Sequence, residues 1–314
     1  MIATIASHDE PEGFIEVSEA AYYERISRQH FQGEGCIVDA GCFIGSSTRA
    51  LLRGLDRFEP KPRGPCPVIA IDRFTVSDHY IAGYFLERGI DIRFGESFLP
   101  VFLQYIEADI ALVEARAGDL TQVGRIDRMI EIAVIDLAKT PMLNAYALQH
   151  WIPRMIPGHG LIVQQDFYSP TQPWIAHGMA SLLDYVSLEL DKVGESAVFR
   201  LERPIPPSVL ADATRGWDRR ESLHRLDRMI ELLGPRASAP LRLMQALALN
   251  SLGETGQARC ILENELGAAT PPADQKWEKW LSAAIVAVMP EAFGSESMLG
   301  RLYWHHGARR LGHE

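Results

Sequence analysis

The chain has 314 residues, 47% of them hydrophobic, and its formal net charge is −10 at pH 7. This length fits one catalytic domain of about 200 residues and a smaller second domain. The acidic balance argues against tight binding to duplex nucleic acid or tRNA, which requires a basic surface. Three further features predict a cytoplasmic protein with reduced thiols and no membrane partner. They are four dispersed cysteines without metal-ligand spacing, no signal-peptide pattern, and no apolar run near the ~20 residues of a membrane span.

Residues 16–29 are predicted to form a helix, and the segment after it contains the strongest motif of the chain. A short apolar run, residues 36–40, carries an acid and leads into a turn and a helix start. The residues of this motif are Asp39, Gly41, Gly45, Ser46, Ser47 and Thr48. Glycine adopts backbone angles closed to other residues and lets a ligand approach the main chain. Hydroxyl residues suit a helix N-terminus, which attracts polar or anionic groups, so in an α/β sheet this turn is where a nucleotide-like cofactor binds.

The acid in this motif limits which cofactor fits. A dinucleotide-binding turn has the spacing G-x-G-x-x-G, which lays a pyrophosphate against bare backbone, whereas this chain has D-x-G-x-x-x-G. A carboxylate repels a pyrophosphate but attracts a cationic amino group. The alternative is an ordinary strand–turn–helix junction that binds no ligand.

Four further apolar runs end in or beside acids, at residues 67–72, 110–116, 131–136 and 160–166. The helical patterns between them predict the βαβ alternation of a parallel sheet, which binds ligands outside the carboxyl ends of its strands. A single acid after a strand is more commonly a turn or N-cap residue, but five in register predict a shared site. These acids are Asp39, Asp72, Asp119, Asp136 and Asp166.

Two strands around a turn at Gly194, within residues 186–201, complete a pattern that resembles the class I S-adenosylmethionine-dependent methyltransferases. The resemblance covers residues 35–203 and implies an α/β fold. Its sheet is Rossmann-like, doubly wound, mostly parallel and seven-stranded, and it ends in an antiparallel hairpin. The resemblance also implies S-adenosylmethionine as cofactor, with the acid of the second strand on the ribose and the Gly-Asp pair after the third strand near adenine. The residues that it assigns to the cofactor are Asp39, Gly41, Gly45, Ser46, Asp72, Gly118 and Asp119.

Residues 135–141 and 147–168 are similar to the macrocin O-methyltransferase group. Its members methylate hydroxyls of sugars or natural products, and several use Mg²⁺ bound by an acid cluster. This chain keeps Asp136 and Asp166 and replaces the other acids of that cluster with Leu137, Ala138 and Gln165. Two carboxylates, the Gln165 amide oxygen and waters could hold Mg²⁺.

Lys139 departs from the pattern of that group. Its charge could take the place of the metal, hold an anionic substrate, or pair with Asp136 at a helix start. Asp136, Asp166 and Lys139 are therefore the candidate catalytic residues, with one of the two acids as general base. Four histidines are further candidates for the base: His79, His150, His159 and His177.

Helical patterns account for much of the remaining chain. Residues 76–108 contain aromatic-rich helical patterns, which favour packing against the sheet over a substrate cover or a dimer contact. After residue 204 the strand patterns stop; helices are predicted at 219–233 and 274–288, and residues 241–263 resemble a tetratricopeptide-type helix–turn–helix. Such helical segments could support a homo-oligomer. The predicted parts are a helical cap (1–33), a methyltransferase domain (34–204), a helical C-terminal domain (205–314) and, within it, a basic aromatic tail (303–310) that docks on the domain or a partner.

Two functions fit this sequence. The first is S-adenosylmethionine-dependent methyl transfer to a hydroxyl of a small polar acceptor, such as a sugar, a glycan or a natural product. The alternative is a catalytically silent protein of this fold, which binds a partner through its helical C-terminal domain and has lost its chemistry with the depleted acids. The acceptor cannot be named from the sequence, because variable loops build the substrate pockets of this fold.

Overall fold

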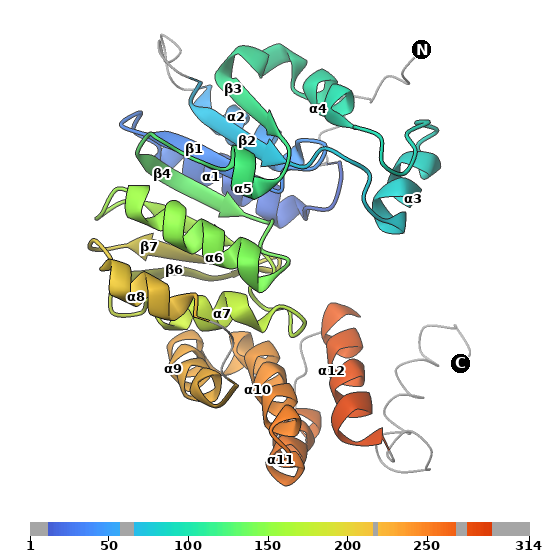
Figure 1. Cartoon of the computed structure of the whole chain (residues 1–314), viewed down its shortest axis with the longest axis vertical. Coiled ribbons are helices and arrows are strands. Elements are labelled where there is room, and N and C mark those ends of the chain that lie inside the picture. The colour runs from blue at the N-terminus through green and yellow to red at the C-terminus, as the bar shows by residue number, and fades with distance from the viewer. Residues whose placement is uncertain (1–11, 57–65, 216–218, 268–274, 291–314) are drawn as a thin grey trace. The chain divides into compact units, whose positions relative to one another are not determined.

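The structure, a computed structural model, describes residues 12–56, 66–215, 219–267 and 275–290 (Figure 1). The chain divides into two compact units. One unit is Met1–Phe167 with Ser181–Arg215, and the other is Tyr168–Ala180 with Gly216–Glu314. The first unit contains the sheet and all five strand-end acids, so the candidate site can be described within it.

Seven strands form one sheet in the order β3-β2-β1-β4-β5-β7-β6. The parallel strands are β1 (Cys36–Ala40), β2 (Val68–Asp72), β3 (Val113–Ala117), β4 (Ile130–Ile135) and β5 (Leu161–Gln164). A hairpin of β6 (Val186–Val193) and β7 (Ser196–Leu201) extends the sheet, with β7 antiparallel to β5. This order confirms the predicted Rossmann-like fold of class I methyltransferases. β1 and β4 are buried throughout, as expected for parallel strands with helices on both faces.

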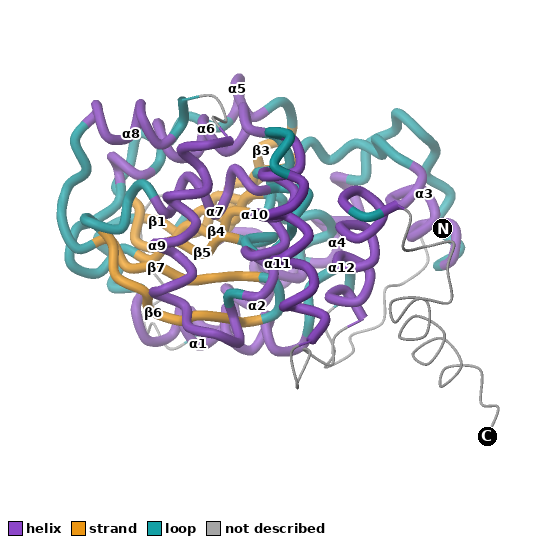
Figure 2. Tube along the Cα trace, turned by 90° about the horizontal axis from the view of Figure 1, so that it is seen from below, coloured by secondary structure: helices purple, strands orange, loops and turns teal. Residues whose placement is uncertain are grey.

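Helices cover the two faces of this sheet (Figure 2). On one face, α1 (Val17–His30), α2 (Ser46–Leu55) and α4 (Leu99–Tyr105) share a hydrophobic core with the strands. On the other lie α5 (Leu120–Val123), α6 (Pro141–His150) with the short turn η2 (Ile152–Arg154), and α8 (Pro207–Ala213). α1 can lie directly on α2 because Gly54 has no side chain, since a Cβ there would be 1.8 Å from Ser27 Oγ. Ser27 donates a hydrogen bond to the Leu51 carbonyl oxygen at 2.7 Å across the same contact.

The third strand begins later than the sequence pattern predicts. Residues 110–116 were expected to form it, but Glu107–Leu112 form a 3-10 helix, η1, and β3 starts at Val113. The reason is the register of the sheet. β2 begins at Val68, and its partner in β3 is Val113, so the residues before Val113 precede the paired part of the sheet.

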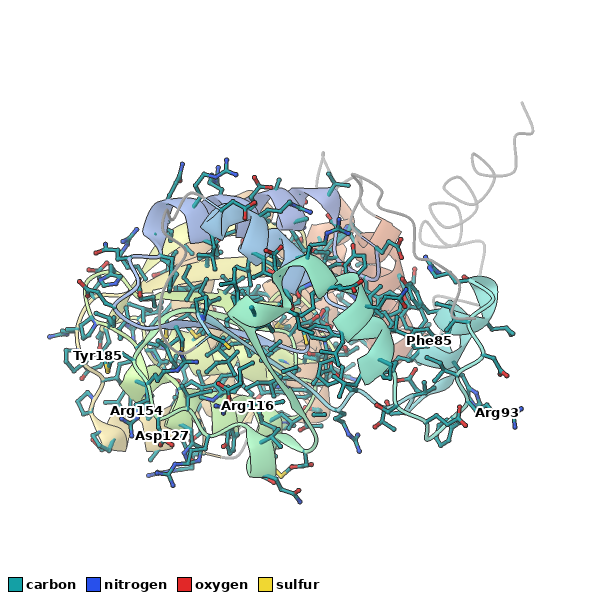
Figure 3. All side chains as sticks on the ribbon, turned by 90° about the horizontal axis from the view of Figure 1, so that it is seen from above. Phe85, Arg93, Arg116, Asp127, Arg154 and Tyr185 are labelled. Carbon is teal, nitrogen blue, oxygen red and sulfur yellow. The ribbon has the colours of Figure 1, made fainter. Side chains whose placement is uncertain are left out.

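An insertion between β2 and β3 lies beyond the carboxyl ends of these strands, where Figure 1 shows α3 (His79–Glu87). Phe85, Phe98 and Phe102 are buried, as the aromatic pattern predicts, whereas Tyr80 is 70% exposed. Figure 3 shows Phe85 and Arg93 of this insertion on the opposite side of the sheet unit from Arg154 and Tyr185. The insertion therefore stands at the same edge as the strand-end acids.

The second unit is helical in its described part. Its helices are α7 (Pro173–Ala180), α9 (Arg219–Ala237), α10 (Ala239–Ser251), α11 (Thr255–Gly267) and α12 (Gln275–Val288). α10, α11 and α12 share a core that includes Leu243, Leu262 and Trp277, and the helical geometry of α9 breaks at Gly234, whose φ is 74°. The tetratricopeptide-type character of α10 and α11 stays a prediction, and the expected tail at 303–310 lies outside the described residues. No helix in the described ranges is long and apolar enough to span a bilayer.

Candidate functional site

The carboxyl ends of the parallel strands gather the predicted acids at one edge of the sheet. The helices after β1 and β4 lie on opposite faces, so β1 and β4 form the switch point where ligands of this fold class bind. Three non-glycine residues near this edge have a left-handed backbone: Phe43 (φ 49°), Phe74 (φ 49°) and Asp166 (φ 55°). They follow β1, β2 and β5. Such conformations are costly and cluster at functional sites, so the backbone independently marks this edge.

Asp39 is the most deeply buried acid of the edge, with 1% of its surface exposed. Its Oδ2 accepts hydrogen bonds from Ser47 Oγ at 2.9 Å and from Thr48 Oγ1 at 2.5 Å. Burial raises the pKa of Asp39 to about 6; the two hydroxyls oppose this rise, and nearby Asp72 adds to it. Hydroxyl dipoles compensate a buried charge only in part, so the negative potential around Asp39 suits a cationic ligand group.

The glycines of the turn are required by conformation and by packing against protein atoms. Gly41 (φ 89°) and Gly45 (φ 104°) both have left-handed backbones. A Cβ at Gly41 would lie 2.7 Å from the carbonyl carbon of Asp136, and one at Gly45 would lie 3.0 Å from the Phe102 ring. Gly41 therefore lets the turn after β1 lie against the end of β4, and Gly45 ends the turn where α2 begins.

Asp72 ends β2 and holds the turn after β1 in place. Its Oδ2 accepts a hydrogen bond from Phe43 N at 2.9 Å, and its Oδ1 accepts one from Phe74 N at 2.9 Å. Burial raises its pKa, against the opposing effect of these backbone N–H groups. A carboxylate has about four lone-pair sites, so Asp72 can accept a further donor beside the backbone N–H groups of Phe43, Phe74 and Arg73.

In the Gly118–Asp119 pair, Gly118 contacts Asp72 and Asp119 caps a helix. Gly118 N donates to the Asp72 carbonyl oxygen at 3.0 Å. Asp119 is exposed and caps α5, because its Oδ1 accepts from Thr121 N at 2.9 Å and from Thr121 Oγ1 at 2.5 Å. These bonds lower the pKa of Asp119. The Asp119 side chain thus caps the start of α5, and the Gly118 backbone connects the pair to Asp72; the predicted cofactor contact of the pair stays a prediction.

The segment before α1 covers the glycine turn, a contact that the sequence pattern did not predict. The Ser46 hydroxyl donates to the Glu12 carbonyl oxygen, and the predicted cofactor contact of Ser46 stays a prediction. Phe14 stacks on Phe43 with ring centroids 4.7 Å apart and on Tyr80 with centroids 4.6 Å apart. The three rings connect this segment, the turn and α3.

At the ends of β4 and β5, Asp136 and Asp166 share one cation. Lys139 Nζ lies 2.5 Å from Asp136 Oδ1 and also contacts Asp166 Oδ2. We call these three residues the lysine cluster. Burial raises the pKa of Asp136 to about 7, opposed by Lys139 and reinforced by Asp166 and Glu19. Burial alone would lower the pKa of Lys139, but the two carboxylates outweigh it and raise that pKa, so the ammonium remains charged.

Behind the lysine cluster lies a buried polar network that the sequence analysis missed. Gln165 Oε1 accepts hydrogen bonds from Tyr23 Oη at 3.0 Å and from Ser196 Oγ at 2.6 Å. Ser196 Oγ also lies 3.2 Å from Glu19 Oε1, and Gly194 leaves the space that the Glu19 side chain fills. Tyr23 and Glu19 belong to α1, so this helix reaches the site from the far end of the sequence. One acid and one tyrosine on an amphipathic helix give no sequence signal of such a function.

The donor set at this edge does not fit the Mg²⁺ that the macrocin-like resemblance implies. Mg²⁺ requires several hard oxygen ligands in octahedral geometry. Lys139 occupies the space between the two carboxylates, and both lone pairs of the Gln165 oxygen are engaged by Tyr23 and Ser196. Within the described residues, no group of three or more His, Cys, Asp or Glu side chains is arranged to hold a metal ion.

The four candidate histidines are dispersed. His79 opens α3 and His150 ends α6. His159 precedes the amino end of β5, and its Nε2 lies 3.7 Å from Glu131 Oε2. His177 belongs to α7 in the second unit, where its Nε2 lies 3.3 Å from Arg225 Nη1. The structure brings none of the four into the contacts of the lysine cluster that are described above.

Comparisons with known proteins add little to this geometry. No protein-family model matches the chain, and no curated protein matches it. Among solved structures, the chain is similar to coclaurine N-methyltransferase bound to N-methylheliamine and SAH. The two are 14% identical, the match covers 80% of this chain and 70% of that chain, and the TM-score is 0.27. That likeness is too distant to bear on activity, so the functional argument rests on the site itself.

Proposed function

We propose that this protein is an S-adenosylmethionine-dependent methyltransferase that methylates a hydroxyl of a small polar acceptor. The observation that carries the proposal is Asp39, a buried carboxylate beside the glycine turn at the switch point of the sheet. No basic side chain of the described residues pairs with it, and only hydroxyls stabilise its charge. A ligand with a cationic amino group supplies the missing charge.

The neighbouring groups fit the rest of such a cofactor. Asp72 holds the turn through the backbone N–H groups of Phe43 and Phe74, and a carboxylate has about four lone-pair sites, which supports its predicted role toward the ribose hydroxyls. Gly118, next to Asp72, brings bare backbone to the adjacent position. Together with the resemblance of residues 35–203, these features favour S-adenosylmethionine over a dinucleotide, whose pyrophosphate Asp39 would repel.

We assign the acceptor to the lysine cluster, which lies at the ends of β4 and β5 on the same edge of the sheet as Asp39 and Asp72. When bound, the cofactor supplies an electrophilic methyl group on its sulfonium. On transfer of that methyl group to the acceptor oxygen, with the electron pair of the broken bond left on the sulfur, Asp136 or Asp166 would accept the proton of the acceptor hydroxyl. A carboxylate whose pKa lies near 7, as for Asp136, is suited to accept a proton at neutral pH. Positioning of the acceptor in line with the methyl group supplies most of the remaining acceleration.

Calorimetric titration with S-adenosylhomocysteine tests the proposal without knowledge of the acceptor. We expect micromolar binding by the wild-type protein and at least about tenfold weaker binding by Asp72→Ala, because that variant loses the ribose contact and the anchor of the turn. Asp127→Ala is the control, since this acid pairs with Arg125 and precedes the amino end of β4, whereas the site lies at the carboxyl ends of the strands. No binding at millimolar ligand would refute the proposal and favour a partner-binding protein of the same fold. Screening of hydroxylated sugars would follow a positive result.

A further inference from the structure

The lysine cluster carries its own cation where the macrocin-like resemblance implies a divalent metal. We propose that Lys139 is the resident cation of this site, that the site works without a metal ion, and that the Lys139 ammonium holds the acceptor oxygen. The part of this inference that concerns the acceptor rests on the proposed function; the part that concerns the cation does not.

The first argument is the convergence of two carboxylates on one nitrogen. Asp136 follows β4 and Asp166 follows β5, two adjacent parallel strands, and oxygens of both contact Lys139 Nζ. Two carboxylates this close repel each other unless a positive charge lies between them. Lys139 supplies that charge, and a metal ion at the same point would have to displace the ammonium against like-charge repulsion.

The second argument is that the backbone directs Lys139 toward this point. Lys139 N donates to the Leu137 carbonyl oxygen at 2.7 Å, which tightens the turn after β4. The next residue, Thr140, caps α6 by accepting from Leu143 N at 3.3 Å, and Pro141 starts the helix. With a turn on one side and a helix start on the other, the Lys139 backbone has little freedom to move.

The third argument is that the ammonium can still reach a ligand. An ammonium has three N–H donors, and the two carboxylates account for two of them. The Lys139 side chain is 48% exposed, compared with 27% for Asp136 and 25% for Asp166, so its third N–H can meet an acceptor from solvent. A hydrogen bond from this charged donor stabilises the acceptor oxygen as its proton leaves for a carboxylate, which is the electrostatic contribution that a metal ion makes elsewhere.

Titration with Mn²⁺, followed by water proton relaxation, tests the resident cation directly. We expect no uptake of Mn²⁺ by the wild-type protein at micromolar concentrations. Lys139→Met removes the charge but leaves both carboxylates, so its Mn²⁺ affinity should rise by at least about tenfold. Adding Asp166→Asn should cancel this gain, and Lys192→Met, which removes an exposed lysine of β6, should behave as wild type. Stoichiometric Mn²⁺ binding by the wild-type protein, or no gain in Lys139→Met, would overturn the proposal.

Nitrogen-15 NMR of the lysine ammonium groups provides a second measurement that needs only conservative variants. An ammonium held by two carboxylates exchanges its protons slowly, so we expect a resolved Lys139 signal at neutral pH that Asp136→Asn or Asp166→Asn abolishes. Exchange as fast as that of free lysine in solution would contradict the ion-paired cluster. Neither experiment uses S-adenosylhomocysteine. These experiments can therefore refute the resident cation while the proposed function holds, and calorimetry can refute the proposed function while the resident cation holds.

Discussion

The two halves of the candidate site stabilise their carboxylates in different ways. Asp39 and Asp72, at the ends of β1 and β2, accept hydrogen bonds from hydroxyls and backbone N–H groups. Asp136 and Asp166, at the ends of β4 and β5, share the full positive charge of Lys139. The first half therefore keeps a negative potential for a cationic ligand, whereas in the second half the chain itself supplies one positive charge for the two carboxylates. An acid at a strand end thus suits ligand binding where the positive charge comes from the ligand, and it forms an ion pair where the positive charge comes from the chain.

Gly41 joins the two halves, so its substitution should have the largest effect. Gly41→Ala places a Cβ 2.7 Å from the carbonyl carbon of Asp136 at a residue whose φ is 89°. We expect the free energy of unfolding to fall by about 3 kcal/mol or more, because left-handed strain and a backbone clash add. Urea unfolding measures this loss. S-adenosylhomocysteine binding should weaken as well, because the clash shifts the turn away from β4.

The matched control for this substitution is Gly158→Ala. Gly158 has the same φ of 89°, but a Cβ there would meet nothing within 4 Å. Gly158→Ala should lower the free energy of unfolding by about 1–2 kcal/mol, because it adds only the left-handed strain. Equal losses in the two variants would show that the close approach of the turn to β4 contributes nothing to stability.

Asp39→Asn separates stability from binding in the first half. Burial raises the pKa of Asp39 from its ordinary 3.8 to about 6, which corresponds to at most about 3 kcal/mol. Between these pH values the unfolded chain loses the Asp39 proton and the folded protein keeps it, so the contribution of Asp39 to stability falls as pH rises and levels off above about pH 6. Asparagine does not titrate and can still accept from Ser47 and Thr48.

The ligand-free Asp39→Asn protein should therefore be more stable than wild type at pH 8, by up to about 3 kcal/mol, with the difference disappearing near pH 4. Its affinity for S-adenosylhomocysteine should fall at least about tenfold, because the amide cannot pair with the amino group of the ligand. Thermal unfolding at the two pH values and calorimetry check both effects. Equal stability at pH 8 would mean that the Asp39 charge is not costly in the folded protein.

The sequence predicted the features that depend on local pattern. The strand-end acids, the left-handed glycines of the turn and the terminal hairpin each follow from residues close together in the chain, and all are found in the structure. Local pattern could not distinguish a ligand contact from a hydrogen bond within the fold, and the side chains of Asp119 and Ser46 have such partners in Thr121 and Glu12. Contacts set by tertiary register were also missed, such as Lys139 with Asp166 and Tyr23 with Gln165. These pairs are 27 and 142 residues apart, and no periodicity connects them.

Tyr23→Phe tests the second half through the network that the sequence did not predict, and its effect should be the smallest. The Tyr23 hydroxyl is buried, and burial raises its pKa well above the ordinary value, so it remains a hydrogen-bond donor to Gln165. Removing it should cost about 1 kcal/mol of unfolding free energy. Because Gln165 precedes Asp166, whose backbone is left-handed, the variant should also speed proton exchange at the Lys139 ammonium.

Tyr22→Phe is the matched control on the same helix, since the Tyr22 ring packs under the Arg25 guanidinium and phenylalanine preserves that packing. It should change neither the free energy of unfolding nor the Lys139 signal. If Tyr23→Phe loses stability but leaves proton exchange at Lys139 unchanged, the network supports the fold alone. If both the stability and the proton exchange change, α1 positions Asp166 for the lysine cluster. The second half of the site then depends on a helix more than 100 residues away in the chain.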